Sequence, residues 1–134
     1  MREVLDELLA WWSAGDVVGA GTVVETFRSA PQPPGATMLV GPDGTVVGSV
    51  SGGCVEGTVY DLAIEVRETR EGALHRFGVS EDEAFSVGLT CGGEIAILVT
   101  AIDKTSFADF DRFVADVEVG RPVALATIIE HPDR

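Results

Sequence analysis

The segment ATMLVGPDGTVVGSV, residues 36–50, constrains the fold most. Two runs of apolar and β-branched residues flank the turn GPDG. Pro42 presets φ for the second turn position, and Gly44 is free to adopt positive φ. The segment therefore predicts a β-hairpin, and with it an antiparallel pairing inside a larger sheet.

Strand-like and helix-like patterns alternate along the rest of the chain. Branched and aromatic residues predict further strands over residues 17–27, 73–79, 94–102 and 121–130. Apolar residues at three- and four-residue spacing predict helices over residues 4–14, 54–71 and 106–119. Ser80 and Glu83 form an S-x-x-E capping box, which predicts a short helix over residues 80–87.

These elements predict an α/β layered domain, with a mixed sheet of about five strands covered by helices. A chain of 134 residues is one domain by length, so we expect residues 1–134 to form a single domain, complete or as the N-terminal part of a longer protein. A Rossmann fold requires G-x-G-x-x-G directly after a strand, and GSVSGG has a different spacing. We therefore expect no Rossmann domain and no NAD site in this chain.

Two strand-like segments resemble each other. VVGAGTVVE, residues 17–25, and PVALATIIE, residues 122–130, align so that Thr22 matches Thr127 and Glu25 matches Glu130. Chance similarity between β-rich stretches explains this, or a second strand-hairpin unit related to the first begins here.

Charge and hydropathy exclude several classes of partner. The net charge is −13, from 9 basic and 22 acidic residues, and there is no basic stripe. Such a field repels a phosphate backbone and an anionic bilayer, so we expect neither nucleic acid nor membrane as a partner. The acids either keep the chain soluble or form a face for a basic protein. MREVLDELLA contains no separate apolar stretch, so we expect no secretory signal, a cytoplasmic location and reduced thiols.

The two cysteines of the chain both lie in glycine-rich turns. Cys54 follows a glycine pair in GSVSGGCVEG, and Cys91 precedes one in GLTCGGE. SGGC leads into a predicted helix, whose N-terminal N–H groups and dipole suit an anion and favour a thiolate. Glu56, in the first turn, either complements that dipole or orients a ligand. If both turns hold one ligand, Cys54 and Cys91 lie at the same end of the sheet, within roughly 10 Å of each other, the span of one small-molecule site.

Four interpretations of the two cysteines compete. They are small buried residues in tight turns, or zinc ligands, or a redox pair, or soft ligands for a cofactor that also carries a phosphate. Zinc requires further ligands, and His75 and His131 lack ligand spacing to either cysteine. C-x-x-C and G-x-S-x-G motifs do not occur, which disfavours dithiol redox chemistry and serine hydrolysis.

The motifs together resemble the XdhC/CoxI family of accessory proteins for xanthine dehydrogenase and carbon monoxide dehydrogenase. The resemblance covers about residues 1–103, and its motifs are GSVSGGCVEG, GLTCGGEI, SAPQPPGATMLV, GPDGTVVGSV and FGVSEDEAFSVGL. It implies a protein that binds molybdenum cofactor transiently, helps its sulfuration and inserts it into a molybdenum hydroxylase. The implied partners are the hydroxylase apoenzyme and a cysteine desulfurase, and a homo-oligomer is left open. Longer members of the family add a Rossmann domain.

Three hypotheses follow from the resemblance: a cofactor carrier, a sulfurtransferase that bears a persulfide on a cysteine, and a scaffold with structural cysteines. Whether the chain is an enzyme therefore stays open. Arg28, in the proline-rich loop over residues 28–36, is a basic group that can clamp the cofactor's phosphate. Molybdenum itself would meet Cys54 and Cys91. The complete set of expected cofactor-binding residues is Arg28, Ser51, Gly52, Gly53, Cys54, Glu56, Cys91, Gly92 and Gly93.

Overall fold

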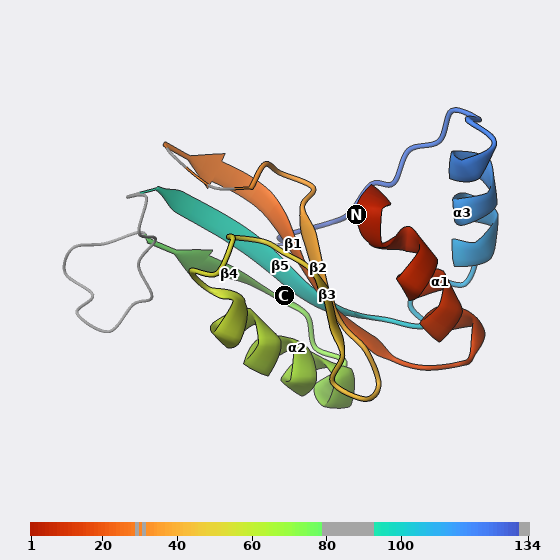
Figure 1. Ribbon diagram of the computed structural model, residues 1–134, viewed down its shortest axis with the longest axis horizontal. Helices are drawn as coiled ribbons and strands as arrows, with labels where there is room; N and C mark the ends of the chain where they lie inside the picture. The colour runs from red at the N-terminus through yellow and green to blue at the C-terminus, as the bar shows by residue number, and fades with distance from the viewer. Residues whose placement is uncertain (29, 31, 79–92, 132–134) are drawn as a thin grey trace.

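The structure is a computed structural model that describes residues 1–28, 30, 32–78 and 93–131. Five strands form one open sheet in the order β3-β2-β1-β5-β4 (Figure 1). The strands are β1 (Val18–Phe27), β2 (Thr37–Val40), β3 (Val46–Gly48), β4 (Ala73–Phe77) and β5 (Glu94–Ile102). The helices are α1 (Leu5–Ser13), which follows a 3-10 turn (Arg2–Val4), α2 (Glu56–Thr69) and α3 (Phe110–Glu118).

The layered α/β domain that the sequence predicts is confirmed, and so is the hairpin. β2 and β3 pair antiparallel around the GPDG turn, where Gly44 has φ +84°. All pairings among the described strands are antiparallel. β3 and β4, joined by α2, run in the same direction but lie at opposite edges. They are therefore never neighbours, so the parallel part of the expected mixed sheet is absent from the described residues.

Helix α2 covers one face of the sheet. Its buried residues Val59, Ala63 and Val66 pack against strand residues that include Val23, Ile97 and Val99. Two glycines of β1 permit this close approach. A Cβ atom at Gly19 would lie 2.5 Å from the Ala63 carbonyl oxygen, and one at Gly21 would lie 2.6 Å from a Val59 methyl group.

Helices α1 and α3 pack together at one end of the sheet, beside the start of β1 (Figure 1). Leu8, Trp12 and Phe110 form a second core cluster with Val18 and Leu39 of the sheet. The Trp12 indole N–H donates to the Phe107 carbonyl at 2.9 Å, so the buried ring keeps a hydrogen-bond partner. Val4, directly before α1, also lies close to Gly48 at the end of β3.

Two helix boundaries differ from the expectation. Helix α2 ends at Thr69, two residues before the expected end at residue 71, and Arg70 takes the left-handed cap conformation with φ 63°. Helix α3 begins at Phe110 rather than near residue 106, because the Asp103 carboxylate accepts the N–H groups of Thr105 and Ser106 and stabilises a turn. Arg70 ion-pairs with Asp103, which joins the two boundaries.

The expected strand over residues 121–130 is not part of the sheet. Residues 121–131 run extended and exposed, without a ladder partner among the described residues. Strand propensity alone does not supply a neighbour, and both sides of β1 are taken by β2 and β5. The expected helix over residues 80–87 lies outside the described residues. None of the helices in the described ranges is long and apolar enough to cross a membrane.

Candidate functional site

Several of the described candidate residues flank the ends of strands. β1 and β4 end where β5 begins, and Phe27 pairs with Glu94 there. β3 runs in the same direction but ends earlier, because Gly48 pairs with Met38, which pairs with Gly21 of β1. Arg28 follows β1, the loop over residues 49–55 follows β3, and Gly93 precedes β5. Figure 1 shows the end of β1 and the start of β5 on the side of the sheet away from α1 and α3.

Cys91 and Gly92 lie outside the described residues, so the predicted distance between the two cysteines stays a prediction. The described flanks of that segment do lie together. A Cβ atom at Gly78, which has φ +77°, would be 2.4 Å from the Gly93 carbonyl oxygen. The chain therefore leaves β4 and enters β5 at adjacent points of this end.

The Glu56 carboxylate organises the loop over residues 49–55. Its Oε2 accepts the Ser49 hydroxyl at 2.6 Å and the N–H groups of Val50 and Ser51 at 3.2 Å each. Its Oε1 accepts the Ser51 hydroxyl and, at 3.1 Å, the Gly53 N–H. Five donors thus converge on one side chain. The loop is wrapped around an anion that the chain itself supplies.

These contacts explain the charge state of Glu56. Burial alone would raise the pKa of Glu56, but hydrogen bonds from Ser49, Ser51 and the backbone N–H groups outweigh it and lower the pKa from 4.5 to about 2. The carboxylate is therefore ionised at any pH near neutrality. Its position in the first turn of α2 also places the negative charge at the favourable end of the helix dipole.

Further hydrogen bonds lie within the loop. Ser51, only 1% exposed, accepts the Val55 N–H through its hydroxyl at 2.9 Å. The Gly52 N–H donates to the Ser49 hydroxyl at 3.0 Å. Gly52 and Gly53 adopt φ +69° and +117°, conformations that side chains disfavour. The N–H groups of Ser51, Gly52 and Gly53, expected to face a ligand, are thus engaged within the loop in this structure.

Cys54 leaves this loop directly before α2. Its side chain is half-buried and packs against the core cluster on the α2 side of the sheet, where its loop neighbours Val50 and Val55 are fully buried. Ala30, from the proline-rich loop, packs against the same cluster. The two loops therefore contact the same core cluster on the α2 side of the sheet.

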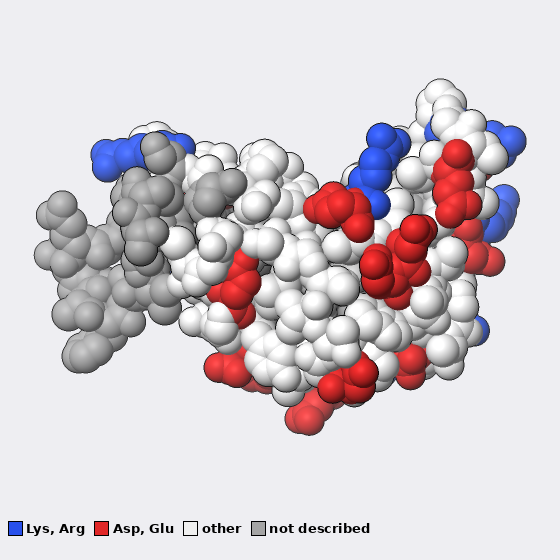
Figure 2. Space-filling model, viewed as in Figure 1, with Lys and Arg blue, Asp and Glu red and all other residues white. Residues whose placement is uncertain are grey.

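Arg28 stands at the end of β1 with φ 62°, in the left-handed region. Its guanidinium lies over the ring of Phe27, 5.3 Å from the centroid, and that ring is 56% exposed. Figure 2 shows basic side chains at two places on this face, over the end of β1 and around α1 and α3, and separate acidic patches over the middle, the lower edge and the side of α1 and α3. The end of β1 is therefore a local positive site on an acidic protein.

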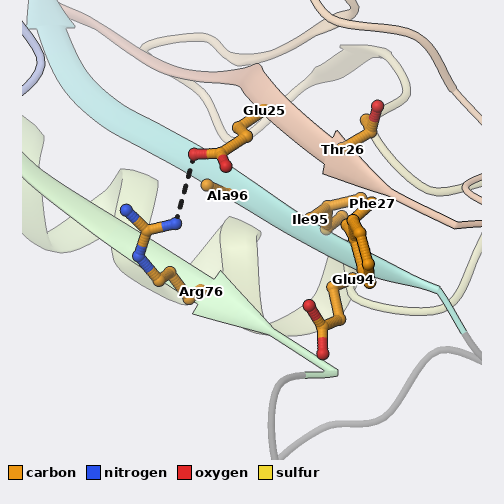
Figure 3. Close-up of a pocket in the computed structure, with 7 residues that line it drawn as sticks. All are labelled: Glu25, Thr26, Phe27, Arg76, Glu94, Ile95 and Ala96. Carbon is orange, nitrogen blue, oxygen red and sulfur yellow. Dashed lines mark hydrogen bonds and ion pairs between the residues drawn. The ribbon is translucent and has the colours of Figure 1, made fainter.

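A shallow hollow of about 60 Å³ lies at the same end (Figure 3). Arg76 of β4 reaches across β5 to Glu25 of β1 at 3.3 Å and also contacts Glu130 at 3.3 Å. Phe27 and Arg76 are not among the residues that the sequence predicts for the site. A signal for Arg76 was present, because Glu25 and Glu130, which it contacts, occupy matched positions in the two similar segments. Both pairs are exposed, so each contributes little to stability.

The described residues contain no group of three or more His, Cys, Asp or Glu side chains that could hold a metal ion.

Comparisons with known proteins give the same picture as the motifs. The chain is 38% identical over 76 residues to the molybdenum cofactor insertion chaperone PaoD of Escherichia coli, which covers 57% of this chain and 24% of PaoD. It is 31% identical over 78 residues to the uncharacterized protein YqeB of the same organism, which covers 58% of this chain and 14% of YqeB. The chain therefore spans a quarter or less of the curated relatives it matches.

A solved structure resembles the fold as well as the sequence. The crystal structure of a protein described as a xanthine dehydrogenase from Bacillus halodurans superposes with a TM-score of 0.63 and 28% identity, over 85% of this chain and 35% of that chain. The sequence model of the XdhC and CoxI family matches residues 11–78, half of the chain, including the loop with Cys54 and Glu56 but not Cys91. This protein belongs to the XdhC and CoxI family.

Proposed function

We propose that this protein binds molybdenum cofactor and helps to insert it into a molybdenum hydroxylase in the cytoplasm. Family membership and the similarity to a molybdenum cofactor insertion chaperone support the proposal. The observation that carries it is the loop locked by Glu56, which holds Cys54 against the core cluster that Ala30, from the same loop as Arg28, also contacts. We treat residues 1–134 as one XdhC/CoxI-like domain.

The residues fit this cargo in part. Molybdenum cofactor carries a soft metal–dithiolene centre and a phosphate, so its binding site needs a sulfur ligand and a cation or N–H donors. Cys54 offers the sulfur, and Arg28 offers the cation. The glycine loop is already filled by Glu56, so in this state it does not offer its N–H groups to a phosphate.

We propose a role for each candidate residue. Arg28 contacts the phosphate, and Cys54 and Cys91 contact the molybdenum centre. Gly92 and Gly93 let backbone approach the cargo closely. Ser51 and Gly53 hold Cys54 in place through Glu56, and Gly52 does so through the Ser49 hydroxyl. Glu56 itself orients the loop and touches the cargo only through it.

Titration of the purified chain with molybdopterin cofactor tests the proposal. Pterin fluorescence reports binding, and we expect Cys54→Ala to weaken it at least about tenfold. Ser13→Ala, on the exposed surface of α1, is the control and should bind like the wild type. Equal affinity of wild type and both single variants, Cys54→Ala and Cys91→Ala, would refute cofactor binding through these thiols.

Sulfuration is a separate question within the same function. If Cys54 or Cys91 carries sulfur as a persulfide received from a cysteine desulfurase, the protein isolated with that enzyme gains the mass of one sulfur, and a thiol reductant removes it. A carrier that only binds cofactor shows an unchanged protein mass. Intact-mass spectrometry of the wild type and the two alanine variants distinguishes these cases.

A further inference from the structure

Phe27, the last residue of β1, is the one aromatic side chain among the large apolar residues that are exposed in the described part of the chain. The guanidinium of Arg28 lies over its ring, 5.3 Å from the centroid, and the residue is still 56% exposed. A single exposed ring is ordinary by itself. Phe27 differs because it lines the shallow hollow at this end of the sheet, beside a carboxylate.

The polar side of the hollow lies on the face of the sheet away from α2. Ile95 packs in the core cluster beneath α2, so its neighbours in β5, Glu94 and Ala96, point to the opposite face. Phe27 pairs directly with Glu94 across the two strands, which places their side chains next to each other on that face. Figure 3 shows the Phe27 ring beside Glu94 and apart from Arg76.

The two glutamates of the hollow have different surroundings. Glu25 is paired with Arg76 at 3.3 Å. Glu94 is half-buried, and its carboxylate makes no hydrogen bond or ion pair with any of the described residues. A carboxylate accepts hydrogen bonds and donates none, so Glu94 offers two oxygens to a ligand that carries N–H groups.

Three properties of this place define the chemistry of a ligand. The hollow is shallow, about 60 Å³, so a flat ligand that stacks on the Phe27 ring suits it better than a bulky one. The Glu94 carboxylate can accept two N–H donors that lie side by side on the edge of such a plate. The Arg28 guanidinium beside the ring favours an anionic group on the same molecule. The 2-amino-4-oxopyrimidine ring of pterins and of guanine carries such a donor pair, on N3 and on the 2-amino group.

We propose that Phe27 and Glu94 bind the pterin ring of the cargo, a refinement that rests on the function proposed above. The ring stacks on Phe27, its N3–H and 2-amino groups donate to the Glu94 carboxylate, and its phosphate-bearing end faces Arg28. Phe27 and Glu94 thus select the ring by its shape and its donor pattern, whereas Arg28 recognises charge.

Two fluorescent ligands without molybdenum or dithiolene test the assignment. They are 6-hydroxymethylpterin phosphate and the matching lumazine, in which an oxo group replaces the 2-amino group. We expect the wild type to bind the pterin at least about tenfold more tightly, because the oxo group of the lumazine and the carboxylate are both acceptors. Glu94→Gln supplies an NH₂ group that can donate to the oxo group, so the preference should fall to about threefold or less.

Two further variants separate stacking from general damage. Phe27→Leu should weaken both ligands by a similar factor, because stacking does not depend on the 2-amino group. Glu65→Gln, at an exposed position of α2, is the matched control and should keep the wild-type preference. Circular dichroism shows whether each variant is folded, and the comparison of the two ligands on the wild type needs no variant.

Guanosine monophosphate separates the two ring systems that share the donor pair. Its ribose holds the phosphate farther from the ring, so we expect it to bind more weakly than the pterin phosphate, and tighter binding would overturn the assignment to a pterin. Equal affinities for pterin and lumazine in the wild type, or an unchanged preference in Glu94→Gln, would overturn it as well. If molybdopterin binds through the cysteines while the wild type shows no preference for the pterin, this inference fails and the proposed function stands. A preference that depends on Glu94 supports the inference even if the cysteine variants bind molybdopterin like the wild type.

Discussion

Replacing Glu56 with glutamine should remove the anion around which the Gly-Cys loop is built. The side chain keeps its size, but it loses its charge and one of its two acceptor oxygens. The donors on Ser49, Ser51 and Gly53 then compete for a single oxygen, and an NH₂ group faces N–H groups. Because buried donors without acceptors are costly, we expect a less stable protein with a looser loop around Cys54.

The pKa of Glu56 sets the magnitude. A shift from 4.5 to about 2 corresponds to at most about 3.4 kcal/mol of stabilisation at neutral pH. The carboxylate is partly exposed, and solvent screening reduces this to about 2 kcal/mol. For a domain of this size, that is a fall in Tm of roughly 6–10 °C.

The same shift fixes the pH dependence. The pKa of Glu56 is lower in the folded state than in the unfolded state, so its stabilisation is complete above pH 4.5 and is lost as the pH falls toward 2. Urea unfolding of wild type and Glu56→Gln from pH 7 to pH 2 should show two curves that converge at the acid end. Glu65→Gln, at an exposed position of the same helix, is the matched control and should follow the wild type.

An anion-rescue experiment separates the role of the carboxylate from general damage. Glu56→Ala leaves the loop donors around an empty space that formate can enter, so formate should raise the Tm of this variant more than chloride at equal ionic strength. The reasoning is refuted if Glu56→Gln is as stable as the wild type at pH 7, or if the two curves stay parallel between pH 5 and pH 2.

Three further predictions follow from other contacts. Gly19→Ala should destabilise the domain by about 2–3 kcal/mol, because the new Cβ would overlap the Ala63 carbonyl; a urea midpoint unchanged from wild type would contradict the close packing of α2 on β1. Asp103→Ala should lower the free energy of unfolding by about 2–3 kcal/mol, because Arg70 loses its ion-pair partner and the N–H groups of the turn before α3 lose their acceptor. A Tm equal to that of the wild type in thermal unfolding would argue against this linkage. Arg28→Ala should weaken molybdopterin binding and make it less dependent on salt. Equal affinities and equal salt slopes for variant and wild type would mean that the loop only connects β1 and β2.

The structure changes how the glycine loop is understood. Glycines before a helix N-terminus predict an anion site, and an anion is present there, but it is the side chain of Glu56. A phosphate would have to displace a carboxylate with a pKa of about 2 to bind in the same place. The phosphate of the proposed cargo is therefore better served by Arg28, which lies outside the loop.

The sequence by itself determined the elements whose signals are local. The GPDG turn predicted the β2–β3 hairpin, and apolar spacing predicted α1 and α2 to within about two residues. Both features depend on neighbours in sequence, through turn conformations and helix periodicity. The quoted Gly-Cys motifs also identified the family, because their order and spacing are specific.

Only the tertiary structure decided which elements meet. The strand order β3-β2-β1-β5-β4 brings the end of β1, the end of β4 and the start of β5 together, although they are far apart in sequence. Arg76 contacts Glu25 and Glu130 for the same reason. Residues 122–130 have the composition of β1 but no partner among the described residues. A strand is stabilised by its neighbours, and composition alone does not say whether a neighbour is there.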